Sequence, residues 1–230
     1  MEFNEESLVD GNVLLINKPL KWTSFQVVNK IRWLIKKQYG IKKIKVGHAG
    51  TLDPLAEGLL IVCTGKMTKK ITEFQNLNKT YIGKFYLGAS TPSFDLETEI
   101  SEKKSIDHLN DDIIQQATTE FKGKILQTPP IYSAIKHKGK KLYEFARKGE
   151  TVTIKRREVF IHEFLISKIN LPEINFKISC SKGTYIRSLA NDYGTKLNCG
   201  AHLKELKRTA IGDYKLENSI SIEDFEKKLK

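Results

Sequence analysis

The chain has 230 residues, of which 40% are hydrophobic, so it is long enough to build one sizeable domain around its own core. Its 39 Lys and Arg residues outnumber its 27 Asp and Glu residues, and the resulting charge of +12 favours an acidic polymer or surface as partner. The N-terminus is acidic and no run of about 18 apolar residues occurs, which excludes an export signal and a membrane-spanning helix. Three widely spaced cysteines argue against a disulfide framework and favour a cytoplasmic location.

The hydrophobic pattern predicts a mixture of strands and helices. A short apolar run covers residues 12–16, and Thr23 with Gln26 forms a capping box before an amphipathic helix. The apolar positions of that helix are Phe25, Val28, Ile31, Leu34 and Ile35. Further strands are predicted over residues 59–63, 79–87, 152–169 and 173–180, and further helices over 67–74, 106–121, 140–147, 184–197 and 222–229. The chain therefore reads as a single α+β body that ends in a polar tail.

One segment, residues 47–58, is too irregular for a helix or a strand and is predicted to be a loop. Three glycines permit unusual backbone angles, and Pro54 fixes the turn just after Asp53. Such a loop can hold Asp53 and His48 at the edge of a cleft. A plain turn is the alternative, because Gly, Pro and Asp also gather in turns without function.

The sequence carries no pattern that calls for a metal or a cofactor. Residues 65–68 resemble the end of a phosphate loop but lack its first glycine. Cys180, Cys199 and His202 lie near one another in the chain, yet no CxxC pair accompanies them. We therefore expect neither a bound metal nor a cofactor.

Three further signals remain, and each has an ordinary structural explanation when taken alone. They are Lys79-Thr80-Tyr81, residues 180–187 with Tyr185 and Arg187, and the basic, aromatic segment 129–147. Tyr81 is also suited to a core strand, and Tyr185 with Arg187 to the start of a helix. Basic clusters are most often solvated faces, although they also bind nucleic acids.

Taken together and in this order, these signals resemble the TruB family of tRNA pseudouridine synthases. The resemblance covers nearly the whole chain, and the segment from His48 to Pro54 is its most specific part. The matching stretches are Ile16-Asn17-Lys18-Pro19, Trp22-Thr23-Ser24, residues 47–56, Lys79-Thr80-Tyr81, residues 130–134, 139–144, 183–187 and 200–203. The resemblance implies the pseudouridine synthase fold, with a mixed, mainly antiparallel central sheet flanked by helices and loops.

The implied activity is isomerisation of uridine to pseudouridine at position 55 in the T loop of tRNA, on a flipped-out base. Asp53 matches the aspartate nucleophile, and Arg187 matches the arginine expected to pair with it and keep it ionised. Tyr81 matches the tyrosine that stacks on the base and takes part in the final proton removal. The implied substrate contacts are His48, Tyr81, Tyr185, Leu206, Lys18, Asp95, Lys140 and Lys141.

The resemblance also implies how the chain is organised and what it binds. Residues 1–230 are expected to form one catalytic domain with a tRNA-gripping insertion at about 125–150 and without a C-terminal PUA domain. Lys140 and Lys141 in the insertion suit the phosphates of the tRNA T-arm. The expected protein is a monomer that uses no guide RNA.

Two alternatives remain open at this stage. One is a guide-dependent synthase of the dyskerin type that acts on another RNA. The other is an RNA-binding or chaperone protein without activity, which the joint presence of Asp53, Tyr81 and Arg187 argues against because binding alone does not require all three.

Overall fold

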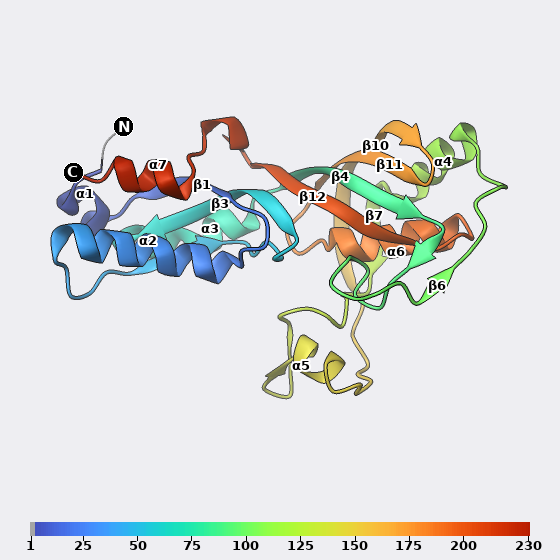
Figure 1. The fold of residues 1–230 in the computed structure, drawn as a ribbon, viewed down its shortest axis with the longest axis horizontal. Coiled ribbons are helices and arrows are strands. Elements are labelled where there is room, and N and C mark those ends of the chain that lie inside the picture. The colour runs from blue at the N-terminus through green and yellow to red at the C-terminus, as the bar shows by residue number, and fades with distance from the viewer. Residues whose placement is uncertain (1–2) are drawn as a thin grey trace. The chain divides into compact units, whose positions relative to one another are not determined.

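The computed structural model of the protein describes residues 3–230, which divide into two compact units. Unit 1 comprises the chain up to Tyr81 together with Leu206–Lys230, and unit 2 comprises Ile82–Glu205. The division falls inside two strands, β4 (Lys79–Leu87) and β12 (Ala201–Ile211), which therefore contribute to both units. Figure 1 shows the elements in chain order, and each unit is described by itself.

The remaining elements belong to one unit each. Unit 1 holds α1 (Glu5–Asp10), β1 (Val13–Lys18), α2 (Ser24–Tyr39), β2 (Val46–Ala49), β3 (Ala56–Thr64), η1 (Gly65–Lys70), α3 (Ile71–Asn76), β13 (Tyr214–Lys215), η3 (Leu216–Asn218) and α7 (Ile222–Lys227), where η denotes a 3-10 helix. Unit 2 holds β5 (Ala89–Ser90), β6 (Glu102–Lys103), α4 (Asp111–Ala117), η2 (Thr118–Phe121), β7 (Gly123–Gln127), β8 (Lys136–His137), β9 (Lys140–Lys141), α5 (Leu142–Ala146), β10 (Arg157–Asn170), β11 (Glu173–Cys180) and α6 (Ile186–Lys196).

The main sheet is mixed and mostly antiparallel. Its strand order is β1-β3-β12-β4-β11-β10-β7, with β2 beside β3 and β13 beside β12. The pairs β1/β3, β2/β3, β10/β11 and β10/β7 are antiparallel, whereas β3 and β12 run parallel. This arrangement confirms the predicted α+β class.

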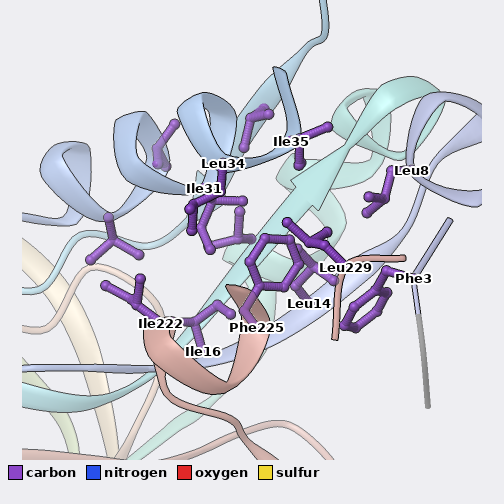
Figure 2. Packing of buried hydrophobic residues seen from close by; sticks show 14 of the residues in the cluster. Phe3, Leu8, Leu14, Ile16, Ile31, Leu34, Ile35, Ile222, Phe225 and Leu229 are labelled. Atoms are coloured by element: carbon purple, nitrogen blue, oxygen red, sulfur yellow. The ribbon is translucent and has the colours of Figure 1, made fainter. Parts of the chain in front are cut away.

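The core of unit 1 forms where α2 and α7 pack against β1 and β3 (Figure 2). Helix α2 begins with the predicted capping box, because Thr23 Oγ1 accepts from the main-chain nitrogen of Gln26 while Gln26 Oε1 accepts from that of Thr23. Its buried side includes Ile31, Leu34 and Ile35, as predicted. Phe25 is a correction: it is 64% exposed because Ser24, Val27 and Val28 occupy the inward side of the first turn.

Several predicted boundaries are wrong for local reasons. The helix expected from residue 106 begins at Asp111, because the Asn110 side chain caps it by accepting from Ile113 N. The strand expected from residue 152 begins at Arg157, where pairing with β7 starts. No strand is predicted for 201–211, yet β12 lies at the centre of the sheet. Its charged side chains, including the fully buried Arg208, conceal the usual strand pattern.

The segment between β7 and β10 carries the small hairpin β8–β9 and helix α5 (Figure 1). The two turn residues of the hairpin, Lys138 and Gly139, both have positive φ, as two-residue turns between twisted strands require. Helix α5 lies within the predicted range 140–147. Within the part of the chain that is described, no helix has the length and apolar character needed to cross a membrane.

Candidate active site

The loop that carries Asp53 is shorter than the sequence predicts. Residues 47–49 belong to β2 and residues 56–58 to β3, so only residues 50–55 are irregular. Pairing between the two strands, with His48 opposite Val62, accounts for the difference. Gly58 is tolerated inside β3 because the strand passes very close to β12: a Cβ there would lie 2.4 Å from the carbonyl oxygen of Arg208.

The residues on both sides of Asp53 are held by hydrogen bonds. Buried Ser24 Oγ accepts from the main-chain nitrogen of Leu52 at 2.9 Å and donates to its carbonyl oxygen at 3.1 Å. On the other side, the nitrogen of Lys21 donates to the carbonyl of Pro54 at 2.8 Å. The half-buried Asp53 is therefore presented from a fixed backbone.

A buried arginine, Arg208 of β12, connects the start of the same loop to β3, the strand that follows it. Its Nη2 donates to the carbonyl oxygen of Gly50 at 3.0 Å, and its Nε donates to that of Leu59 at 2.8 Å. Sequence reasoning missed both Arg208 and Ser24. Nothing in the polar C-terminal segment distinguishes Arg208 from the neighbouring surface cations.

We expect Arg208→Met to lower the free energy of unfolding by about 2–4 kcal/mol, because two main-chain carbonyls lose their buried donor. Lys207→Met is the matched control: Lys207 forms a partly exposed ion pair with Glu57 at 3.0 Å, and the expected cost is below about 1 kcal/mol. Urea unfolding of both variants measures the difference. Equal losses would contradict the role assigned to Arg208.

Lys18, at the end of β1, is fully buried in unit 1. Its ammonium donates to the carbonyl oxygens of Pro19 at 2.9 Å and Trp22 at 2.5 Å. Burial lowers the pKa of Lys18 from 10.5 to about 8; the negative charge of Asp53 opposes this shift and the positive charge of Arg208 adds to it. Lys18 is thus placed to act on Asp53 through its charge, while its direct contact with substrate stays a prediction.

This pKa shift of Lys18 predicts a pH dependence of stability. Because the folded-state pKa lies below the unfolded value, the unfolded chain binds more protons between about pH 8 and 10.5, and the contribution of Lys18 to stability rises through that window. Below about pH 8, Lys18 is charged in both the folded and the unfolded state, and the full free-energy cost of burying its charge remains. Relative to Lys18→Met, the wild type is expected to gain about 1–3 kcal/mol across the window. Urea unfolding at several pH values tests this, and parallel curves would contradict it.

His48 lies half-buried on β2. Burial lowers its pKa, and the charge of Arg208 lowers it further, so the imidazole is neutral at neutral pH. Its Nδ1 is buried without a hydrogen-bond partner among residues 3–230. A neutral ring with an unused buried nitrogen suits contact with a ligand better than proton transfer.

Two more predicted site residues belong to unit 1. Tyr81, on β4, is buried with 8% of its surface exposed. Leu206, on β12, is half-buried and stands opposite Ala56 in the parallel pairing with β3, so it lies beside the strand that leaves the Asp53 loop. Unit 1 therefore carries Tyr81 and Leu206 on the adjoining strands β4 and β12, and Asp53 on the loop that leads into β3, the next strand of the sheet.

In unit 2, Arg187 and Asp95 form a buried ion pair. Arg187 Nε lies 3.5 Å from Asp95 Oδ2, and its Nη1 donates to the carbonyl of Ser93 at 3.3 Å. Residue Arg187 is 3% exposed to solvent and Asp95 is 4% exposed. The pairing of Arg187 with Asp53 that the resemblance implies stays a prediction. Asp95 acquires a structural partner that sequence reasoning did not foresee.

The other predicted contacts of unit 2 lie around the insertion and at the start of α6. Tyr185 directly precedes α6, and the guanidinium of Arg157 lies 4.5 Å from its ring centre. Lys140 and Lys141 are exposed on β9. Arg147 at the end of α5 pairs with Glu97 at 3.6 Å, which connects the insertion to the rest of unit 2.

Residues 3–230 contain no cluster of three or more His, Cys, Asp or Glu side chains suited to a metal ion. The three cysteines are buried, and none forms a disulfide. The candidate site residues themselves supply a carboxylate, cations and aromatic rings. The expectation that no metal or cofactor is needed stays a prediction.

This fold, a mixed sheet with an aspartate loop between β2 and β3, is that of the pseudouridine synthases. A family model described as "TruB family pseudouridylate synthase (N terminal domain)" matches residues 36–186, and one described as "tRNA pseudouridylate synthase B C-terminal domain" matches residues 187–230. The chain belongs to the TruB family of pseudouridylate synthases, which are isomerases.

Relatives and a solved structure agree with this assignment. The tRNA pseudouridine synthase B of Flavobacterium johnsoniae is 56% identical over 97% of this chain and 98% of the relative, and that of Phocaeicola vulgatus is 54% identical over 94% and 92%. A chain from the crystal structure of a Cbf5-Nop10-Gar1 complex is similar with a TM-score of 0.72 and 29% identity, covering 97% of this chain and 55% of that one.

Proposed function

We propose that the protein converts uridine to pseudouridine at position 55 in the T loop of tRNA, with Asp53 as the reacting carboxylate. The observation that carries the proposal is the Asp53 loop itself. Its carboxylate is half-buried, its neighbours Leu52 and Pro54 are held by hydrogen bonds, and a buried ammonium, that of Lys18, interacts with its charge. A carboxylate held in this way is prepared to react without first reorganising its surroundings.

The isomerisation needs a carboxylate and no external reagent. The bond between N1 of uracil and C1′ of ribose breaks, the uracil turns, and C5 of the same base bonds to C1′. The C5 proton is lost and N1 gains a proton, so no atom enters or leaves overall. In the proposed role, Asp53 forms a covalent intermediate with the nucleoside, as carboxylates do in glycosyl transfer.

The proposal includes flipping of the target uridine out of its stack. Flipping costs a few kcal/mol, which aromatic contacts and phosphate neutralisation can offset. Tyr81 stacks on the extruded base and takes part in removing the C5 proton, while His48, Tyr185 and Leu206 line the pocket. Asp95 pairs with Arg187 and is proposed to contact the substrate in addition. Arg187 is proposed to keep Asp53 ionised and correctly aimed.

The insertion supplies the proposed grip on the tRNA T-arm. Lys140 and Lys141 are exposed on a hairpin whose two-residue turn sets their direction. Lys141 Nζ also lies 5.5 Å from the ring of Tyr143, which combines a cation with an aromatic surface for RNA. A single catalytic domain over residues 1–230 and a monomeric state are part of the same proposal.

Joint replacement of Lys140 and Lys141 by alanine is expected to weaken tRNA binding and to flatten its salt dependence by a slope of about 1–2, since each lost phosphate contact removes about one released counterion. Fluorescence anisotropy at several salt concentrations measures the slope. Lys103→Ala with Lys104→Ala is the matched control, because both are exposed on or beside β6 in the same unit. A wild-type slope for the Lys140/Lys141 variant would remove both residues from the interface.

Two observations favour this function over the alternatives. Relatives matching nearly their whole length carry the name tRNA pseudouridine synthase B, which supports a tRNA substrate over a guide-dependent reaction. The hydrogen-bonded support on both sides of Asp53 argues against a protein that only binds RNA, because binding alone gives no reason to fix the backbone that carries a half-buried carboxylate.

The test uses the whole chain and an unmodified tRNA transcript, without any guide RNA. Pseudouridine is mapped by chemical labelling after incubation with the protein. A transcript with cytidine in place of uridine 55 is the control. We expect modification of the first transcript at that position and none in the control. Modification at another position, or none at all, would contradict the proposal.

A further inference from the structure

The main chain of Tyr185 is held by a side chain from a different strand. Gln127, the last residue of β7, is fully buried. Its Oε1 accepts from the nitrogen of Tyr185 at 2.8 Å, and its Nε2 donates to the carbonyl oxygen of the same residue at 2.9 Å. Both polar atoms of one buried amide therefore bind one residue, which fixes the backbone position and direction of Tyr185.

The ring of Tyr185 is held from the neighbouring strand. Arg157 stands opposite Gln127 in the pairing of β10 with β7, and its guanidinium lies 4.5 Å from the centre of the Tyr185 ring. Arg157 Nε and Nη2 are buried and have no hydrogen-bond partner within residues 3–230. The face of the Tyr185 ring therefore favours this position of the Arg157 guanidinium. A guanidinium over the ring face in turn restricts where the Tyr185 ring can lie.

A third bond connects the same two segments. Ser188 Oγ donates to the carbonyl oxygen of Thr128 at 2.7 Å. Residues 127 and 128 therefore hold the segment 185–188, which includes Arg187. The segment between β7 and β10 leaves the sheet directly after Gln127 and returns directly before Arg157, so the strand residues at both of its ends contact Tyr185.

We propose that Gln127 is a positioning residue that, together with Arg157, holds Tyr185 and the adjoining start of α6 in the geometry needed for reaction. The inference rests on the proposed function, in which Tyr185 lines the uridine pocket.

The test compares Gln127→Met with the wild type in single-turnover reactions with protein in excess and saturating over the tRNA transcript. Methionine keeps the side-chain length and removes both hydrogen bonds. We expect the rate constant to fall about 10- to 100-fold, the loss associated with small misplacements of reacting groups. The Kd for tRNA is expected to stay close to wild type, because the phosphate contacts of the insertion are untouched.

Gln115→Met is the control for loss of a glutamine hydrogen bond elsewhere in unit 2, since exposed Gln115 donates to the main-chain carbonyl of Ile166 at 3.2 Å. A general loss of folding lowers the concentration of active protein and leaves the rate constant at saturation unchanged. A wild-type rate constant for Gln127→Met, or a loss confined to Kd, would overturn the inference.

A second variant guards against a Gln127→Met protein that fails to fold. Gln127→Glu keeps the acceptor for the Tyr185 nitrogen and loses only the donor when ionised. We expect a smaller loss of rate, which decreases as the pH falls and the carboxyl regains a donor. A pH profile parallel to the wild type would contradict the inference. If the wild-type protein itself modifies no tRNA, the proposed function fails rather than the role of Gln127.

Discussion

Asp53→Asn is expected to lower the single-turnover rate of pseudouridine formation by at least about 10³-fold while tRNA affinity stays close to wild type. The amide has the size of the carboxylate but cannot form the covalent bond that the proposed reaction requires. The loop is expected to keep its shape, because Ser24, Lys21 and Arg208 hold its main chain on both sides of Asp53.

Glu57→Gln provides the matched control for this prediction. Glu57 lies four residues beyond Asp53 in the same unit and pairs with Lys207 at a partly exposed position. Its neutralisation is expected to leave the rate unchanged. Quench-flow or timed mapping of pseudouridine, together with anisotropy for binding, separates the two effects. Comparable activity of the Asp53→Asn protein would remove Asp53 from the reaction.

The second large effect concerns the buried pair of Arg187 and Asp95. Asp95→Leu is expected to lower the free energy of unfolding by about 3 kcal/mol, because a buried guanidinium loses its carboxylate. Arg187→Met is expected to cost a similar amount, since it leaves Asp95 as a buried carboxylate. Urea unfolding measures both losses.

The double variant distinguishes stability from catalysis. Arg187→Met combined with Asp95→Leu is expected to lower the free energy of unfolding by at least about 1 kcal/mol less than the sum of the two single losses. The reason is that both charges of the pair are removed together. Its rate is nevertheless expected to stay at least about 10²-fold below wild type, since the cation proposed to act on Asp53 is missing. Additive stability losses would contradict the pairing, and a restored rate would contradict the catalytic role.

Much of the fold follows from local patterns. The capping box of α2 and the strands β4 and β11 lie where the sequence predicts them, because each depends on neighbouring residues. The strand β12 was not predictable in this way. Its buried Arg208 is compatible with a central strand because the carbonyls of Gly50, in the loop, and Leu59, in β3, accept from it.

The site shows the same division. Asp53, Tyr81 and Arg187 are recognisable from the sequence because reactive side chains occur in specific short motifs. Ser24, which holds the Asp53 loop, and Gln127, which holds Tyr185, are ordinary polar residues in the sequence. Their roles depend on which main-chain groups lie within hydrogen-bonding distance after folding.

The sequence by itself determined the family, the α+β class and the identity of the candidate reactive residues, because motif chemistry and hydrophobic periodicity are local properties of the chain. Only the tertiary structure decided that Lys18 is fully buried with its ammonium bonded to main-chain carbonyls, that Arg187 pairs with Asp95, and that Gln127 holds Tyr185. Burial and pairing join residues that lie far apart in the chain, and their energies depend on the surroundings that folding creates.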